Sequence, residues 1–349
     1  MIYLEIYKHN GITGTYTRID EITAFSQLNW FRKSSGVSGI GFLLNIFDKK
    51  ATLANLLFGN VVVVKNDNAI EHVGWITDRT ASKNNETVTI SCIDIVGRLS
   101  RFDTTQETVY TNQDAGDIAM ALITEVQSRT GGNLGIVEGT IAATTDRDRT
   151  YRYKEIGGAI TDLSDVIGGF DFEFVPQSNA GRLTGFVFNV AAELGSLRTD
   201  LPKLVEGENI TNLDVVLQNL ISNAVTSTGE GFGELAPSEA VEDSGSIASY
   251  ARYEKTNKYS DVSVSSNLLE KANEFLNDNK NEKQHIEFSI MPNSNIDIDL
   301  LHLGDTLVID TKSDAPILAV VGFARLVELA YDVDEEGVRQ CHPKVEFYR

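Results

Sequence analysis

The sequence predicts a β-rich α+β protein, and three patterns along the chain support that prediction. Residues 1–104 consist mostly of short runs rich in β-branched and aromatic residues, separated by turns such as HNGITG and SKNNE. Asn and Gly in such turns adopt the positive φ values that tight hairpins require. Residues 105–205 combine helical and strand patterns, and residues 206–349 return to strands that surround one clear helix. We therefore expect two antiparallel β units with an intervening α+β module.

The first β unit, residues 1–104, is predicted to be an antiparallel barrel or sandwich. Its strand patterns include YLEIY, FSQLNWFR, VVVVK, EHVGWITD and TVTISCID. In TVTISCID, Val88, Ile90 and Cys92 occupy alternate positions, which is typical of a strand with one face toward a core. We interpret VGWITD as an interior strand in which Trp75 is a packing anchor and Asp78 opens the next turn. A short helix is expected in IVGRLSRF, directly after this strand series.

Two helices and two strands are predicted in the α+β module, residues 105–205. The first helix begins at Asp114, whose carboxylate can cap it, and stops at Gly131 and Gly132. The second helix lies in EIGGAITDLSDVIGG. Its apolar stripe consists of Ile156, Ile160, Leu163 and Ile167. The strands FDFEFVP and GFVFNVA follow it and complete the module.

The second β unit, residues 206–349, is predicted to carry an inserted loop and helix at about residues 229–295. The stretch GEGFGELAPSEAVEDSGSIASYAR is rich in Gly, Ser and Glu, which predicts a long loop. SSNLLEKANEFLNDNK has an apolar stripe at helical spacing, and Ser266 or Asn267 can cap it. Strand patterns resume in HIEFSIMP and continue to the end of the sequence.

Composition argues against several classes of function. The 349 residues include 30 basic and 50 acidic side chains, for a formal net charge of −20. Binding to nucleic acid or to an anionic membrane surface requires clustered Lys and Arg, so we expect neither kind of binding. No apolar run approaches the roughly 20 residues that span a bilayer, and the start lacks the features of a signal peptide. We expect a protein made and kept, or assembled, in a cytoplasm.

No residue pattern specifies a catalytic, cofactor-binding or metal site. Cys92 and Cys341 are expected to be buried, reduced thiols, and the five histidines lack the spacing of a zinc site. The glycines of GVSGIGF fit neither the Rossmann nor the P-loop spacing, so we interpret them as turn residues. His302 and Asp305 could form half of a triad, but no nucleophile elbow accompanies them. We therefore expect no enzyme activity and no cofactor.

Two clusters of carboxylates are the remaining candidates for chemistry. Asp146 and Asp148 alternate with Arg147 and Arg149 in TTDRDRT, which we interpret as an exposed, self-neutralising loop.

The second cluster, Asp297 and Asp299 with Asn293 and Asn295, would share one face of NSNIDID if this segment were a strand. Calcium needs six to eight oxygen ligands, usually on a loop with a glycine, so a solvated strand face is favoured over an ion site.

The order of several local patterns resembles one known family. The N-terminal YLEIY is followed by S-x-L-x-W-x-R at Ser26, Leu28, Trp30 and Arg32, and by GN-x-V-V-V, VGWITD and CIDIVGRLSR. Later come GENITNLDVVLQNLISNAVTSTGEG, SSNLLEKANEFL and the "GD" turn of HLGDTLVID. Together they resemble the baseplate hub proteins of tailed bacteriophages, in particular hubs of long non-contractile tails that infect Gram-positive hosts. These hubs are similar to the contractile-phage baseplate hub family, and the resemblance covers nearly the whole chain.

The resemblance implies two tail-tube-like antiparallel β-barrels and a homotrimer whose six barrels form a pseudo-sixfold ring. Such a ring adapts the sixfold tail tube to a threefold tip, holds the end of the tape-measure protein and lets DNA pass without specific binding. The implied partners are a distal tail protein or tail tube ring, the tape-measure C-terminus and tail fibre or tip proteins. The implied location is the tail tip of the virion. Some relatives add a C-terminal hydrolase or fibre domain, whereas this sequence ends at Arg349 directly after a strand pattern.

Two other functions stay open at this point. A carbohydrate-binding or cell-surface-binding β protein would need a groove lined with exposed aromatic residues. The two tryptophans, Trp30 and Trp75, lie in alternating strands where burial in a core is expected. A cell-wall hydrolase would need a carboxylate pair that the sequence does not single out.

Overall fold

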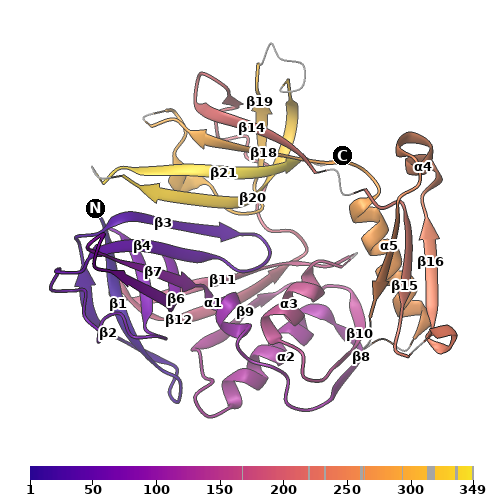
Figure 1. Ribbon diagram of the computed structural model, residues 1–349, viewed down its shortest axis with the longest axis horizontal. Coiled ribbons are helices and arrows are strands. Elements are labelled where there is room, and N and C mark those ends of the chain that lie inside the picture. The colour runs from indigo at the N-terminus through magenta and orange to yellow at the C-terminus, as the bar shows by residue number, and fades with distance from the viewer. Residues whose placement is uncertain are drawn as a thin grey trace. The chain divides into compact units, whose positions relative to one another are not determined.

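The computed structural model describes residues 1–166, 168–218, 221–231, 233–259, 262, 264–292, 294–312, 319–334 and 337–347. The chain, drawn in Figure 1, divides into two compact units, each described here by itself. Unit 1 comprises Met1–Asp165, Gly169–Leu213 and Glu287–Tyr348. Unit 2 comprises Val166–Gly168, Asp214–Ile286 and Arg349.

The N-terminal strands of unit 1 form one antiparallel series. They are β1 (Ile2–Asn10), β2 (Thr15–Ile22), β3 (Ser26–Lys33), β4 (Gly39–Asn45), β5 (Val61–Asn66), β6 (Ala69–Ser82) and β7 (Thr87–Ile93). Their order in the sheet is β3-β4-β7-β6-β5-β1-β2. Val61–Val64 of β5 are fully buried, because this strand lies between β1 and β6 in the sheet.

The C-terminal strands continue the same sheet. They are β13 (Leu204–Val205), β14 (Ile210–Gln218), β18 (Lys283–Ile290), β19 (Thr306–Asp310), β20 (Val321–Val333) and β21 (Arg339–Phe347). β20 pairs with β3, and Tyr331 lies opposite Trp30 in this register. The full order runs β14-β18-β21-β20-β3 and on to β2. The β-rich α+β class is thereby confirmed, while the division into two closed barrels stays a prediction.

The α+β module lies between these two strand groups in the sequence. Its elements are α1 (Ile95–Leu99), β8 (Thr108–Asp114), α2 (Ala115–Ser128), β9 (Ile136–Ile141), β10 (Asp146–Tyr151), α3 (Ile156–Ser164), β11 (Asp171–Asn179) and β12 (Arg182–Ala191). β11, β12 and β9 form one sheet, in which β9 runs parallel to β12. α2 contacts α3 and β9. The predicted cap of α2 is confirmed, since Asp114 accepts from Gly116 N at 2.9 Å. The structure also shows that Asp94 caps α1 by accepting from Gly97 N at 2.9 Å.

The core of unit 1 joins the N-terminal strands to the module. Trp75 of β6 is 2% exposed, and its ring lies 5.7 Å from that of Phe186 in β12. The buried cluster continues through the apolar faces of α2 and α3, including Leu122 and Ile160. Trp75 is therefore the packing anchor that the sequence predicted. Ile167, the last predicted member of the α3 stripe, lies outside the described residues.

Unit 2 is a small sheet covered by a helix. β15 (Ala224–Thr228) pairs antiparallel with β16 (Ser238–Glu242) and parallel with β17 (Glu254–Lys258). α5 (Ser265–Asn279) packs on β15 and β16 through a small apolar cluster around Val225, Ala272 and Leu276. This unit also contains two short helices, η1 (Gly233–Leu235) and α4 (Ser244–Tyr250).

Three local predictions were wrong. The polar stretch after β15 is not a long loop, because it contains η1, β16 and α4. Neither Ser266 nor Asn267 caps α5, since the N-cap residue is Val264 and no side chain makes a capping bond. Asp78 does not open a turn, because β6 continues to Ser82 past a register shift at Ile76 and Asp78.

Candidate functional site

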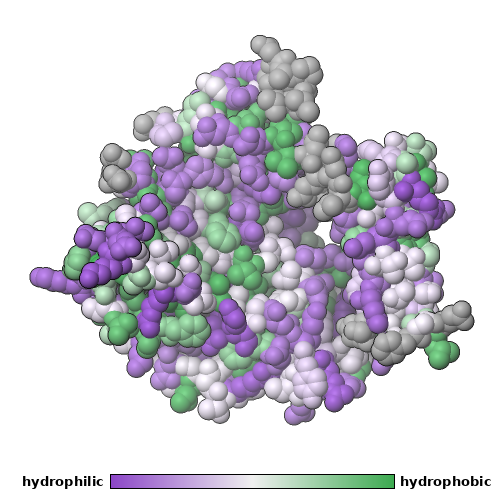
Figure 2. All heavy atoms as spheres, in the orientation of Figure 1, coloured by the Kyte–Doolittle hydropathy of each residue, from purple (hydrophilic) through white to green (hydrophobic). Residues whose placement is uncertain are grey.

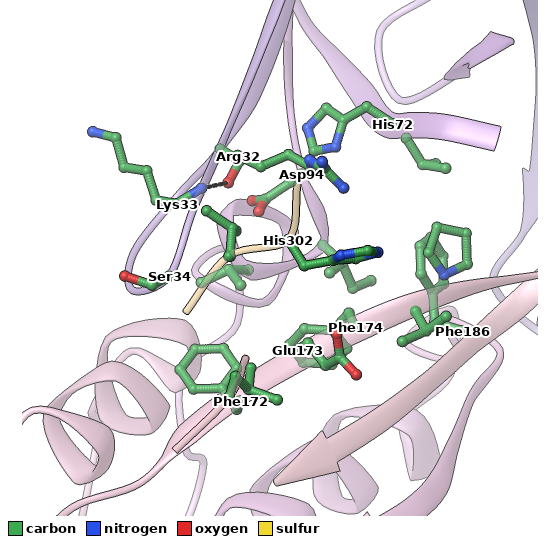
Figure 3. Close-up of a pocket in the computed structure, with 18 of the residues that line it drawn as sticks. Arg32, Lys33, Ser34, His72, Asp94, Phe172, Glu173, Phe174, Phe186 and His302 are labelled. Carbon is green, nitrogen blue, oxygen red and sulfur yellow. Dashed lines mark hydrogen bonds between the residues drawn. The ribbon is translucent and has the colours of Figure 1, made fainter. Parts of the chain in front are cut away.

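A cavity of about 380 Å³ lies within unit 1, where the N-terminal strands meet the α+β module. The end of β3, the start of β6, the N-terminus of α1, β11 and the segment at His302 contribute to its wall (Figure 3). These segments are far apart in the sequence, so only the folded chain assembles the cavity. Its size is within the lower range of small-molecule sites in proteins, which hold roughly 300–1,000 Å³.

One wall of the cavity is aromatic because β11 alternates. Phe172 and Phe174 are two residues apart in FDFEF and so lie on the same face of the strand. Their rings are 6.0 Å apart, and Phe174 lies 4.9 Å from Phe188 of β12. Phe186 lines the cavity from β12 (Figure 3). The wall is thus continuous with the core and is held rigid by it.

The opposite wall carries Arg32 and His72. Arg32 Nη2 contacts Tyr331 Oη at 3.4 Å, and the guanidinium lies 5.8 Å from the centre of that ring. Among the described residues, no carboxylate lies within ion-pair distance of Arg32, and His72 Nε2 has no hydrogen-bond partner. His72 is 9% exposed. Burial, together with the nearby positive charge of Arg32, lowers the pKa of His72 to about 3, so the ring is neutral at physiological pH.

The acidic side chains of the cavity already have partners. Asp94 caps α1, and burial raises its pKa to about 7 even though hydrogen bonds from Gly97 and Ser38 oppose this. Glu71 pairs with Arg339 Nη1 at 2.8 Å. Glu173 accepts a hydrogen bond from Asn189 Nδ2 at 3.0 Å. The donors that remain without acidic partners are therefore on the Arg32 and His72 side.

His302 and Asp305 lie in one turn, with His302 Nδ1 3.7 Å from Asp305 Oδ2. Asp305 is 2% exposed and accepts hydrogen bonds from Ser196 N at 3.0 Å, His302 N at 3.1 Å and Arg198 Nη1 at 2.8 Å. Asp305 therefore connects the loop at Ser196 and Arg198 to the turn that precedes β19. Gly304, in the same turn, has φ +86°, and a Cβ there would lie 2.2 Å from Leu194 O. The pair is thus a structural turn, and only His302 faces the cavity (Figure 3).

The segment around Asp297 and Asp299 is not a strand, contrary to the sequence prediction. Asp297 caps the short helix η2 (Ile298–Leu300) and accepts from Asp299 N at 3.0 Å. Asp299 itself forms an ion pair with Arg339. Asn293 lies outside the described residues, and within the described part of the chain no group of three metal-ligating side chains occurs.

The segment around Asp146 and Asp148 is a strand rather than the predicted exposed loop. It forms β10, which pairs with β8 through a register shift after Arg147. Arg147 is 6% exposed, whereas Asp148 accepts a hydrogen bond from Asn112 N at 2.7 Å. The alternation of acid and base here reflects the two faces of a strand.

The remaining candidates are buried, as predicted. Cys92 and Cys341 are free and buried, and burial raises the pKa of the Cys341 thiol to about 12, which disfavours the reactive thiolate. Trp30 and Trp75 are 1% and 2% exposed, so neither can stack on a sugar. None of the described helices is long and apolar enough to cross a membrane.

No family model and no curated protein sequence matches the chain. The structure is similar to the tail protein from Neisseria meningitidis MC58, with a TM-score of 0.60 and 14% identity over 99% of this chain and 96% of that one. It is also similar to the prophage MuSo2 43 kDa tail protein from Shewanella oneidensis, with a TM-score of 0.61 and 12% identity over 98% of both chains. The prophage tail protein gp18 from Listeria monocytogenes EGD-e follows, with a TM-score of 0.53 and 10% identity over 99% and 94%. The predicted resemblance to phage tail proteins is therefore confirmed in the fold.

Proposed function

We propose that this protein is a structural component of a phage tail and acts as the hub of the tail tip or baseplate. The observation that carries this proposal is the fold shared with phage and prophage tail proteins over almost the entire length of both chains. Full-length coverage matters because a single shared module would leave the rest of the chain open to another function. The hub role itself comes from the order of local patterns described above.

The proposed hub is a homotrimeric ring of six tail-tube-like barrels, two from each chain, that adapts a sixfold tube to a threefold tip. Two groups of antiparallel strands, β1–β7 and β18–β21, support this arrangement because they flank the α+β module. The proposed division of the chain places domain boundaries near residues 104 and 205 and an insert at about 229–295. These boundaries stay predictions.

The proposed partners are a distal tail protein or tail tube ring, the tape-measure C-terminus and tail fibre or tip proteins. DNA would pass through the channel without specific binding. The net charge of −20 supports such a passage, because like charges keep phosphate groups from adhering. Hydrophilic residues cover much of the face shown in Figure 2, with apolar residues in smaller patches between them. The proposed location is the tail tip of the virion, and the proposed role involves no catalysis.

Mass photometry of the purified chain tests the proposal. A species of three copies is expected, alone or after mixing with tail tube and distal tail proteins, because the hub is a ring of three chains. Fluorescence anisotropy with a duplex DNA at low salt is expected to show no binding. A chain that stays monomeric in every mixture, or that binds duplex DNA with a steep salt dependence, would contradict the hub.

A further inference from the structure

We propose that the cavity of unit 1 binds a carboxylate joined to an apolar group about the size of one aromatic residue. The inference goes beyond the proposed hub function and does not depend on it. It rests on two side chains that have no acidic partner in the described part of the chain, Arg32 and His72, on one side of the cavity, and on an aromatic wall on the other (Figure 3).

The donors define the polar half of the ligand. A guanidinium presents its N–H groups in a planar fork that matches a carboxylate, and Arg32 has no carboxylate partner among the described residues. His72 is nine-tenths buried, and its Nε2 has no partner in the described structure. A buried polar atom without a partner is costly, so a ligand that supplies the acceptor gains that free energy. Neutral His72 can donate from Nε2 in the tautomer that carries its proton there.

The aromatic wall defines the apolar half. Phe172, Phe174 and Phe186 line the cavity, and the packing of Phe186 against Trp75 fixes the position of its ring. A ligand ring on this wall would gain contact area without ordering a flexible loop. The volume of about 380 Å³ is large enough for one aromatic residue with its carboxylate.

The neighbouring acids exclude the opposite charge pattern. Glu71 is neutralised by Arg339, Glu173 accepts from Asn189, and Asp94 caps α1 with a raised pKa. A cationic ligand on the side of Arg32 and His72 would lie beside a like charge, and the acids Glu71 and Asp94 already have partners. A carboxylate on this side would instead give Arg32 the acidic partner that it lacks among the described residues, which is why we assign an acid rather than an amine.

The required chemistry can come from two sources, a free aromatic acid or the carboxyl terminus of a polypeptide that ends in an aromatic residue. Ligand-observed NMR titration of the full chain separates them. The first probe is N-acetyl-L-phenylalanine, with N-acetyl-L-phenylalanine amide and acetate as its controls. The second is a pentapeptide ending in Phe with a free carboxyl terminus, compared with the same peptide amidated.

The expected result is binding of at least one of the two free-carboxyl probes, the acid or the pentapeptide, with the matching amide bound at least about tenfold more weakly. Acetate is expected to bind more weakly still, because it makes no contact with the aromatic wall. Binding of only the free acid assigns a small-molecule ligand, and binding of only the pentapeptide assigns a chain terminus. Equal binding of acid and amide, or no binding of either free-carboxyl probe, would overturn the proposal.

Two substitutions locate the binding. Arg32→Gln removes the guanidinium. It should weaken binding of the acid probe about tenfold or more and leave the weak binding of the amide unchanged. Arg101→Gln is the matched control, because Arg101 is exposed and does not line the cavity. Arg32→Lys keeps the charge without the planar fork and is expected to fall between wild type and Arg32→Gln. Thermal unfolding checks that each variant folds, and unchanged acid binding by a folded Arg32→Gln protein would also refute the site.

Discussion

Unit 1 and unit 2 both place helices against a sheet, but different forces hold them together. In unit 1, aromatic and branched side chains such as Trp75 and Phe186 form a continuous buried cluster between strands and helices. The buried apolar cluster of unit 2 is small, and a fully buried amide, Asn223, connects its loops. Asn223 Nδ2 donates to Ala251 O at 2.7 Å, and its Oδ1 accepts from Tyr253 N at 2.8 Å.

We therefore expect the two units to respond to different perturbations. A cluster of apolar side chains loses stability when volume is removed, because a cavity remains. A hydrogen-bonded centre loses stability when one partner is removed, because buried donors and acceptors are left unpaired. The predictions below separate these two cases, beginning with the largest effect.

Trp75→Ala is expected to have the largest effect and to act on unit 1. Removing the indole leaves a cavity beside Tyr16 and Phe186, which should cost about 3–5 kcal/mol of unfolding free energy. Denaturant unfolding measures the change. Phe58→Ala is the control, since Phe58 is 69% exposed and should change stability by less than about 0.5 kcal/mol. A soluble Trp75→Ala protein of wild-type stability would contradict the role of Trp75 as anchor.

Asn223→Ala is expected to destabilise unit 2 by about 1–3 kcal/mol, because Ala251 O and Tyr253 N lose their partner. Hydrogen exchange should accelerate in β15 and β17 and stay unchanged in β5 and β6. Asn273→Ala is the matched control, since Asn273 only bonds back to Leu269 O on its own helix. Equal exchange in wild type and Asn223→Ala would show that the polar centre is dispensable.

Asp94→Asn tests a buried carboxyl group in unit 1. The pKa of Asp94 is about 7 in the folded protein against its ordinary value of 3.8, so the folded state holds its proton more tightly. This contribution to stability is complete below about pH 4 and is lost as the pH rises through about 7. Asn retains a good capping side chain but cannot titrate. In the wild type, the unfolding free energy should decrease between about pH 4 and 7 as Asp94 loses its proton. We expect this decrease to be absent from the variant.

Asp114→Asn is the control for that experiment. Burial raises the pKa of Asp114, but hydrogen bonds from Thr144, Asp117 and Gly116 outweigh it, and the net shift is downward. The contribution of Asp114 is therefore present at neutral pH and is lost as the pH falls through its lowered pKa. Its removal should leave the slope between about pH 4 and 7 intact. The same change of slope in both variants would mean that Asp94 is not the titrating group.

Arg252→Gln is expected to have the smallest effect. Arg252 pairs with Glu242 at 2.7 Å and Glu254 at 2.6 Å, but all three side chains are exposed and screened by solvent. Thermal unfolding should show no resolvable change in unit 2. A loss comparable to that of Asn223→Ala would mean that surface ion pairs, rather than the buried amide, stabilise this unit.

Apolar periodicity accounts for most of the fold that could be predicted. The cap Asp114 and the buried Trp30 and Trp75 follow from local patterns of capping and alternation. The region after β15 was misjudged because polar contacts organise it. Its strand β16 has the sequence SEAVE, and the loops there bond to Asn223, which no periodicity reveals.

The candidate site was harder to predict than the fold. Arg32 belongs to a quoted motif and His72 is one of five scattered histidines, but neither pattern shows that they share a cavity with Phe174. That proximity depends on the pairing of β3, β6 and β11 with their neighbours across long stretches of chain. Among the residues that the structure describes, Arg32 has no acidic partner, and this property of the folded chain has no signature in the sequence.

The hub proposal is the central claim, and images of the purified chain test it most directly. Class averages from negative-stain or cryo-electron microscopy are expected to show a ring with threefold symmetry and a central channel, alone or with tail tube proteins. Particles the size of one chain under all these conditions would contradict the account, as would a closed assembly without a channel.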